Sequence, residues 1–275
     1  MTANWLIYAL GGGHGHGVRG DILRRTLVEL GEKVTMVTTP RAHGLLARAG
    51  DDIAGIHAAE NLESMRQRIL DREFSHLVVD TFAEGWNQEL PELLAYFEHR
   101  LLIRRYRSDE VDESAYDQIL SPYCETSDEW EEPFRRGSYT GLLVRPNGLH
   151  FEQGDEWDLI ILNPSRINSP RLSKLFSKRS GLRIKQTRRY EGERARKFLC
   201  IGAGYNSVYE GLRCDADVCF VPLPRHYDNQ RHRVELRGVG ICSEPEFEAW
   251  LERPYERRPT NFKAPSLRLQ LKGVA

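Results

Sequence analysis

The stretch LGGGHGHGVRG, Leu10 to Gly20, holds six glycines and two histidines in eleven residues. The apolar run NWLIYAL precedes it, and a segment with apolar residues at helical spacing follows it and ends at Gly31. The run KVTMVTT comes next. Strand, glycine-rich turn, helix and strand in this order predict a βαβ unit. We therefore expect the glycine stretch to lie at the carboxyl end of a buried parallel strand, where ligands bind in such folds.

The glycines of this stretch favour a ligand-binding loop. Glycine lets a backbone approach a ligand closely, and the first turn of a helix offers unpaired N–H groups to an anion. We expect Gly12, Gly13 and Gly15 to form this loop, with the helix running from Val18 to Leu30. A tight strand-to-helix turn without any ligand is the alternative.

Length and composition restrict the class of protein. The chain has 275 residues, of which 40% are hydrophobic and 29% charged, as is typical of a soluble globular protein of one large or two small domains. No apolar run is long enough to cross a bilayer, and we find no signal-peptide pattern. The five cysteines are Cys124, Cys200, Cys214, Cys219 and Cys242. They form no CxxC pair, so we expect reduced thiols and a cytoplasmic protein.

The formal net charge of −1 conceals two strongly charged segments. Residues 108–132 contain ten acids and no lysine or arginine, whereas residues 166–197 contain twelve bases and two acids. Two solvated surfaces would account for both segments. Alternatively, the basic segment lines a site for phosphates or another polyanion.

Strand-like and helix-like segments alternate along both halves of the chain, with further helices expected over Arg41–Ala49 and Gln88–Phe97. Such alternation predicts parallel sheets covered on both faces. We expect an α/β fold of two Rossmann-like, doubly wound domains facing a cleft, in an unusually compact form. The domains would cover residues 1–147 and 148–245, and residues 246–275 would form a helix and tail that pack back toward the first domain.

A second glycine-rich loop, IGAGYNSVYEGL, occurs in the second half. Gly202 and Gly204 open its backbone, and Asn206 or Ser207 can cap the following helix. Glu210 then lies one turn inside that helix, where a carboxylate could accept hydrogen bonds from sugar hydroxyls. An ordinary helix cap and a solvated glutamate are the alternatives.

The stretch VPLPRHYDNQRHRVE follows the next predicted strand. Its two prolines fix an irregular loop. Arg225 and His226 can contact phosphate, while Asp228, Asn229 and Gln230 bring groups that recognise hydroxyls to the start of a helix. An ordinary capped loop would have the same pattern.

These two stretches carry a resemblance to a known family. GAGYNSVYE followed by PLPRHYDNQRHRV resembles the donor-binding half of GT-B glycosyltransferases, in particular the MurG-like N-acetylglucosaminyltransferases and related bacterial predicted glycosyltransferases. GGGHGH is similar to their GGTGGH, VVDTFAEGWNQEL to their D-x-F-x-x-G…E-L stretch, and TGLLVRP to the end of their first domain. The resemblance implies transfer of a sugar from a nucleotide diphosphate donor. It favours a UDP-sugar as this donor and implies that no metal or other cofactor is required.

The resemblance also implies roles for individual residues. Glu210 would bind the ribose and Gln230 the sugar, while Gly12, Gly13 and Gly15 would form a loop for the acceptor or the diphosphate. The implied donor-binding set is Gly202, Gly204, Tyr205, Asn206, Ser207, Glu210, Arg225, His226, Asp228 and Gln230. The expected partners are a nucleotide sugar and a small-molecule, lipid-linked or nucleic-acid acceptor, with a homodimer left open.

Glycosyl transfer requires an acceptor hydroxyl to lose its proton, which a neutral histidine can take up near pH 7. We favour His16 as this base, with His14 and Asp80 as the other catalytic candidates. Asp80 could act as a base itself or orient a histidine. A metal site is a further alternative. Its candidate ligands are His14, His16, His226, Asp228 and His232. Nothing in the sequence fixes the geometry of these ligands, and we expect no metal.

Two other classes of function stay open. GHGVRG, Gly15 to Gly20, is a literal GxGxxG, and Arg41 could bind the 2′-phosphate of NADP in an oxidoreductase. The basic segment 166–197 could contact a phosphate backbone in a nucleic-acid-directed glycosyltransferase. A non-catalytic binder of sugar nucleotides is the third alternative.

Overall fold

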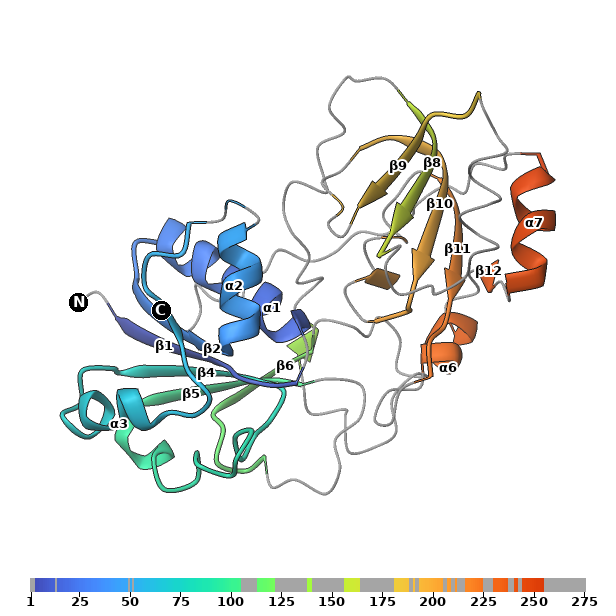
Figure 1. Cartoon of the computed structure of the whole chain (residues 1–275). Helices are drawn as coiled ribbons and strands as arrows, with labels where there is room; N and C mark the ends of the chain where they lie inside the picture. The colour runs from blue at the N-terminus through green and yellow to red at the C-terminus, as the bar shows by residue number, and fades with distance from the viewer. Residues whose placement is uncertain are drawn as a thin grey trace. The chain divides into compact units, whose positions relative to one another are not determined.

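The computed structural model divides the chain into two compact units, residues 1–143 with 264–275, and residues 144–263. It describes residues 3–12, 14–48, 50, 52–104, 113–121, 138–139, 156–163, 181–187, 190, 193–204, 207–208, 211, 216–224, 230–236, 240–241 and 244–254. Each unit contains a parallel sheet with helices (Figure 1), which confirms the predicted α/β class. The domain boundaries proposed from the sequence stay a prediction.

The first unit contains a seven-stranded parallel sheet of order β3-β2-β1-β4-β5-β6-β7. After β1 the chain moves outward through β2 to β3 and then returns to β4 on the other side of β1, so β1 and β4 form the point where the winding reverses. The strands are β1 (Asn4–Ala9), β2 (Lys33–Thr38), β3 (Ile56–Ala58), β4 (His76–Asp80), β5 (His99–Ile103), β6 (Gln118–Ser121) and β7 (Ser138–Tyr139). The helices are α1 (His14–Glu29), α2 (Pro40–Arg48), α3 (Glu63–Leu70) and the 3-10 helix η1 (Leu94–Tyr96).

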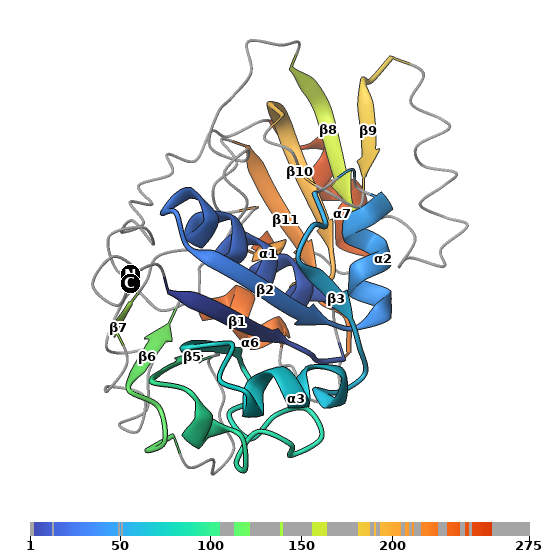
Figure 2. The same cartoon turned by 90° about the vertical axis from the view of Figure 1, so that its left-hand side faces the viewer.

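Both faces of this sheet are covered, as the alternation along β1 requires. Trp5 and Ile7 pack in the cluster that contains residues of α1 and α2. Leu6 and Tyr8 pack in the opposite cluster, with residues of α3. Figure 2 shows α1 and α2 on one face of the sheet and α3 on the other.

Most of the glycine-rich stretch is helical, because α1 begins at His14 and not at Val18. Its glycines permit close packing. A Cβ atom added at Gly17 would lie 2.7 Å from Ala42 Cβ, and one added at Gly20 would lie 2.8 Å from Ala9 Cβ. The stretch therefore brings α1 against α2 and against the sheet, and Gly15 lies in the first turn of α1 and not in a loop before it.

The helix expected over Gln88–Phe97 is wrong, since only Leu94–Tyr96 forms a 3-10 turn. Gln88 has a φ of 60°, in the left-handed region, and Pro91 follows it. An α-helix needs right-handed backbone and an N–H group at each interior position. The segment instead forms an irregular loop.

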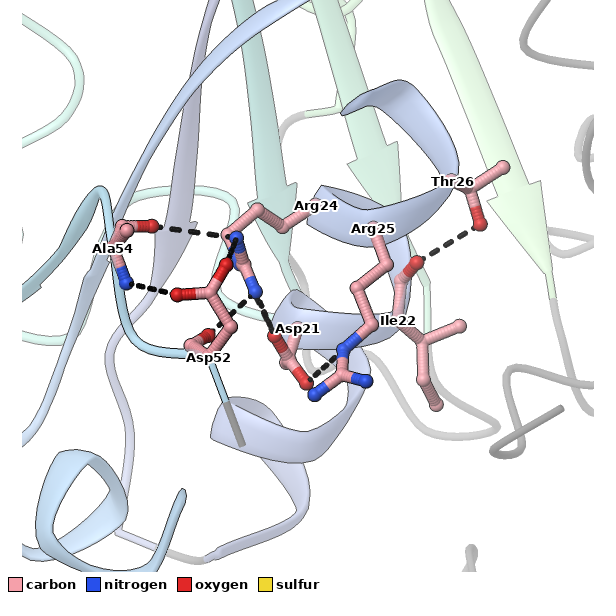
Figure 3. A network of polar contacts seen from close by, with 7 residues as sticks. All are labelled: Asp21, Ile22, Arg24, Arg25, Thr26, Asp52 and Ala54. Atoms are coloured by element: carbon pink, nitrogen blue, oxygen red, sulfur yellow. Dashed lines mark hydrogen bonds and ion pairs between the residues drawn. The ribbon is translucent and has the colours of Figure 1, made fainter. Parts of the chain in front are cut away.

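A buried ion-pair network joins α1 to the segment before β3 (Figure 3). Asp21 Oδ1 accepts hydrogen bonds from Arg24 Nε at 3.1 Å and Nη2 at 2.9 Å, and its Oδ2 accepts one from Arg25 Nε at 2.9 Å. Arg24 Nη2 also donates to the carbonyl of Asp52 at 2.7 Å, and Arg24 Nη1 to that of Ala54 at 3.3 Å. Arg24 therefore holds the loop before β3 against α1.

The Asp21→Asn variant is expected to lose about 3 kcal/mol of unfolding free energy, because it leaves the buried guanidinium of Arg24 with only the exposed carboxylate of Asp52, 3.9 Å away, as a counter-charge. Urea denaturation measures this loss. Arg25→Ala is the matched control: its side chain is 40% exposed, so the loss should be within about 1 kcal/mol. Equal losses in both variants would contradict this account of the network.

The second unit contains a parallel sheet of order β12-β11-β10-β8-β9. The strands are β8 (Trp157–Leu162), β9 (Ile184–Thr187), β10 (Ala195–Ile201), β11 (Asp217–Val221) and β12 (Gly240–Ile241), and the helices are α6 (Gln230–Leu236) and α7 (Glu244–Glu252). One face packs with Val208 and with Val234 of α6, and the other with Phe247 and Trp250 of α7.

The helix α7 packs on the second sheet. The expected packing of residues 246–275 toward the first domain stays a prediction. The apolar side of α7 cannot leave the second sheet without exposing Phe247 and Trp250. A buried lysine of β10 also forms hydrogen bonds with the C-terminal end of α7. Lys197 Nζ donates to the carbonyls of Trp250, Leu251 and Arg253 at 2.6, 2.8 and 2.7 Å. A cation at a helix C-terminus pairs with carbonyl groups that lack intrahelical partners.

The oxidation state of the cysteines differs from the expected one. Cys219 in β11 is disulfide-bonded, whereas Cys200 in β10 carries a thiol that donates to the carbonyl of Gly202 at 3.1 Å. The expectation that all the cysteines are reduced is therefore wrong. Among the residues described above, no helix combines the length and the hydropathy needed to cross a bilayer.

Candidate functional site

The winding of the first sheet brings together two side chains that lie 64 positions apart in the sequence. His16 lies in the first turns of α1, directly after β1, and Asp80 is the last residue of β4. The strands β1 and β4 are parallel neighbours, with Tyr8 opposite Val79. In open α/β sheets, ligands bind outside the carboxyl ends of the strands at such a reversal of the winding.

The two side chains form a buried contact. His16 Nδ1 lies 2.6 Å from Asp80 Oδ2. His16 is 5% exposed and Asp80 is fully buried. The sequence analysis named both residues and allowed Asp80 to act as a base or to orient a histidine. The contact supports the second role, since the carboxylate already faces the imidazole.

A third residue completes the cluster. Arg19, one helical turn after His16, donates from Nε to Asp80 Oδ1 and from Nη2 to Asp80 Oδ2, both at 2.8 Å. Its side chain is 2% exposed. Burial alone would raise the pKa of Asp80, but the charge of Arg19 and the contacts with His16 outweigh it, so this pKa lies well below its usual range. Asp80 is therefore ionised at neutral pH.

An ionised carboxylate only accepts hydrogen bonds, so it selects one tautomer of the imidazole. Nδ1 of His16 carries the proton and donates to Asp80, which leaves Nε2 as the basic nitrogen. Arg19 Nη2 lies 3.3 Å from the same Nδ1, a longer contact than the 2.6 Å to the carboxylate. His16 can thus accept a proton at Nε2 while Asp80 holds the ring in place.

The backbone after β1 and a ring after β4 fix the imidazole on two sides. A Cβ atom added at Gly11 would lie 2.6 Å from His16 Cδ2, so only glycine fits beside this ring. Phe82 stacks on His16 with ring centroids 5.2 Å apart and an interplanar angle of 25°. The ring position is therefore built into the fold.

Of the other predicted residues in this unit, Gly12 lies in the loop before α1 and is exposed. His14 is the first residue of α1, and its side chain, like the whole of Gly13, lies outside the described residues. The sequence analysis did not identify Arg19 or Phe82. Arg19 follows His16 by three positions within α1, a spacing that could have indicated it. Phe82 lies in the loop after β4, where no helical spacing applies.

In the second unit, the predicted glycine loop follows β10. Gly202 has a φ of 89°, in the left-handed region where glycine is favoured. A Cβ atom added at Gly204 would meet nothing within 4 Å, so packing does not require glycine there. Ser207 is helical, and Val208 N–H donates to the carbonyl of Gly204 at 3.0 Å, as the first turn of a helix does.

Gln230 joins this loop to the next one. It is the first residue of α6 and is 4% exposed. Its Oε1 accepts hydrogen bonds from the backbone N–H groups of Ala203 at 2.7 Å and Leu223 at 3.0 Å. This side chain thus holds the loop after β10 beside the loop after β11.

Six predicted donor residues lie outside the described residues: Tyr205, Asn206, Glu210, Arg225, His226 and Asp228. Of these six, His226 and Asp228 were also candidate ligands of the alternative metal site, together with His14, His16 and His232. Within the described part of the chain, no group of three or more histidine, cysteine, aspartate or glutamate side chains is placed to hold a metal ion.

The literal GxGxxG match, Gly15 to Gly20, lies entirely within α1. A phosphate-binding fingerprint needs its first glycines in the turn before the helix. Gly17 and Gly20 instead face Ala42 and Ala9. The geometry gives no support to the oxidoreductase alternative.

No family model matches the sequence, and no curated protein matches it. Solved structures do match the fold. The spinosyn rhamnosyltransferase SpnG, complexed with thymidine diphosphate, has a TM-score of 0.57 and 12% identity, over 98% of this chain and 99% of that one. UGT89C1 of Arabidopsis thaliana, complexed with UDP-L-rhamnose, has a TM-score of 0.58 and 12% identity, over 100% and 93%.

A third similar structure has a different activity. The UDP-GlcNAc 2-epimerase of Methanocaldococcus jannaschii, in complex with UDP-GlcNAc and UDP, has a TM-score of 0.55 and 11% identity, over 98% and 99% of the two chains. At these identities the likeness shows the fold, which is of the GT-B type, as the sequence resemblance implied.

Proposed function

We propose that this protein is a glycosyltransferase that uses a nucleoside diphosphate sugar, with His16 as the base that deprotonates the acceptor. The observation that carries the proposal is the buried contact of His16 with Asp80 at the point where the winding of a GT-B-type sheet reverses. A histidine held by an ionised carboxylate is a common arrangement for general-base catalysis.

In the proposed reaction, Nε2 of His16 takes the proton of an acceptor hydroxyl. The hydroxyl oxygen forms a bond to the anomeric carbon of the donor sugar, while the bond from that carbon to the diphosphate oxygen breaks. The electron pair of the broken bond leaves with the diphosphate. Asp80 stabilises the imidazolium through Nδ1, and Arg19 keeps the carboxylate ionised and correctly oriented.

The second unit is proposed to bind the donor. Gly204 leaves open space at the end of β10, and a helical turn begins just after it, which suits a diphosphate. Gln230 would then position both loops of the donor site, in addition to the sugar contact that the family resemblance implies. A UDP-sugar is the first donor to test, and Glu210 is proposed to bind its ribose.

Donor binding is tested by calorimetry with UDP, GDP and dTDP, each with and without EDTA, and with NADPH as a control. We expect one nucleoside diphosphate to bind regardless of EDTA and to stabilise the fold by about 2.7 kcal/mol at 100 times its Kd. Gly204→Val should raise this Kd at least about tenfold, because its side chain fills the proposed ligand space.

Gly181→Val is the matched control, since a Cβ atom at Gly181 also meets nothing within 4 Å. Both variants should melt close to the wild type, and only Gly204→Val should lose donor affinity. Binding of NADPH alone would refute the proposal. Mass analysis of products must separate transfer from conversion of the donor, because a similar fold occurs in an epimerase.

A further inference from the structure

The loop after β4 exposes a tryptophan near the proposed base. Trp86 is 45% exposed, one of three large apolar side chains that are exposed in the described part of the chain, with Val28 and Leu182. Single exposed apolar residues are normal on protein surfaces, so exposure alone indicates nothing. Trp86 differs from an ordinary exposed residue in the hydrogen bonds and ring contacts that fix its position.

Hydrogen bonds anchor the backbone of Trp86. Its N–H donates to the hydroxyl of Tyr8 at 2.5 Å, and that hydroxyl donates to Glu89 Oε1 at 2.7 Å. Asn87 N–H donates to the other oxygen of Glu89, also at 2.7 Å. Tyr8 is fully buried in β1, and its burial raises its pKa, so it stays a neutral donor. The loop is therefore fixed to the sheet.

The same loop contains unfavourable backbone. Thr81 and Gln88 have φ values of 83° and 60°, in a region that residues other than glycine rarely adopt. Each such residue costs about 1–3 kcal/mol, and such residues cluster at ligand-binding and active sites. Gly85 has a φ of 90°, and a Cβ atom there would lie 2.7 Å from Glu89 Oε2. The fold thus maintains a loop with unfavourable backbone conformations, and this loop exposes the indole of Trp86.

A series of rings leads from this indole to His16. Trp86 meets Phe82 edge to face, with centroids 4.9 Å apart and an interplanar angle of 65°. Phe82 in turn stacks on the imidazole of His16. Trp86 also lies beside Gly12, where an added Cβ atom would lie 3.2 Å from Cη2 of the indole. The exposed indole is thus one ring away from the proposed base.

We propose that Trp86, Phe82 and Gly12 form a subsite that binds a ring of the acceptor, a pyranose or an aryl group, by stacking it on the indole. This inference rests on the proposed function. The indole has an apolar face of the size of such a ring, and stacking there would hold a hydroxyl of the same molecule near His16 Nε2. Trp86 is accordingly a residue that determines acceptor specificity.

The charges of the loop argue against a nucleic-acid acceptor at this subsite. Residues 81–90 contain two acids, Glu84 and Glu89, and no lysine or arginine. Proteins that bind single-stranded nucleic acid combine stacking aromatic residues with a positively charged groove. The loop has the aromatic residue without the positive charge, so a neutral ring suits it better than a polyanion.

The test uses the full chain labelled with 5-fluorotryptophan, which gives one fluorine signal for each of the five tryptophans. Trp86→Phe assigns the signal of Trp86. The probes are 4-nitrophenyl β-D-glucopyranoside, methyl β-D-glucopyranoside, 4-nitrophenol and an oligothymidylate, the small molecules at up to about 20 mM, where ligands with millimolar Kd bind. We expect the nitrophenyl glucoside to shift the Trp86 signal saturably, and one of its two fragments to do so alone.

Variants then test the contact. We expect Trp86→Ala to weaken binding of the nitrophenyl glucoside at least about tenfold, measured by calorimetry, and Trp86→Tyr to retain most of it. Val28→Ala, which removes an exposed apolar side chain from α1, is the matched control and should change nothing. The response to methyl glucoside or to nitrophenol identifies the ring as pyranose or aryl.

Three outcomes would overturn the inference: no shift of the Trp86 signal with any probe, a shift with oligothymidylate alone, or unchanged affinity in Trp86→Ala. None of these depends on donor binding. If UDP, GDP and dTDP all fail to bind the wild type, the proposed function fails, while a ring bound at Trp86 would still be detected. Donor binding without any ring binding would instead remove only the acceptor subsite.

Discussion

Replacing His16 by glutamine is expected to lower kcat for glycosyl transfer by about 10²–10⁴-fold, because the acceptor hydroxyl loses the proposed proton acceptor. Glutamine keeps a polar group beside Asp80 but has no basic nitrogen. The donor contacts are proposed to lie in the second unit, so the Kd of the donor should be unchanged. Steady-state kinetics and calorimetry on the same preparation separate the two quantities.

His57→Gln is the matched control for this variant, because His57 is an exposed residue of β3. It should leave kcat and the donor Kd unchanged. If His16→Gln retained the wild-type kcat, another group would have to be the base, and the contact of His16 with Asp80 would have a structural role only.

Replacing Asp80 by asparagine is expected to impair both activity and stability. The asparagine amide can donate to Nδ1 of His16, which then shifts its proton to Nε2 and can no longer accept one there. The loss in kcat should approach that of His16→Gln. The buried guanidinium of Arg19 also loses its counter-charge, so unfolding free energy should fall by about 3–5 kcal/mol.

The pH dependence of stability has a definite sign. The pKa of Asp80 is lower in the folded protein than in the unfolded chain, where it is about 3.9. Its contribution to stability is therefore full above pH 5 or so, and it falls as pH decreases toward the folded pKa. The difference in unfolding free energy between wild type and Asp80→Asn, measured by urea denaturation, should narrow below about pH 4.

The double variant Arg19→Met with Asp80→Asn distinguishes the two effects of Asp80. Removing both members of a buried ion pair costs much less stability than removing one. The double variant should regain much of the lost unfolding free energy, whereas its kcat should stay low, because His16 still lacks the carboxylate. A recovery of kcat together with stability would show that Asp80 acts on folding alone.

The regular part of the fold was predictable because its signals are local. The expected strand over Lys33–Thr38 coincides with β2, and that over His76–Asp80 with β4. Both are short apolar runs bounded by polar residues or turns. The start of α1 was missed by four residues because glycine has a low helix propensity, whereas here close packing on Ala42 and Ala9 favours it.

The site was predictable only in part. His16 and Asp80 could be named from their positions after apolar runs, but their contact depends on the pairing of β1 with β4, which no local pattern encodes. Arg19 was missed because the helix was expected to start at Val18, which hid the one-turn spacing from His16. Trp86 was missed because its position depends on a hydrogen bond from its backbone N–H to the hydroxyl of the distant Tyr8, which no local pattern encodes.

The lysine that caps α7 decides how far the second unit can be shortened. A version of the chain that ended before Trp250 would remove all three carbonyl oxygens that receive Lys197 Nζ and would leave an ammonium ion inside β10 with those acceptors gone. Asp217, which is buried and pairs with Arg253, would lose that partner by the same cut. A shortened form of the chain that keeps these contacts therefore has to extend at least through Arg253, well past β12.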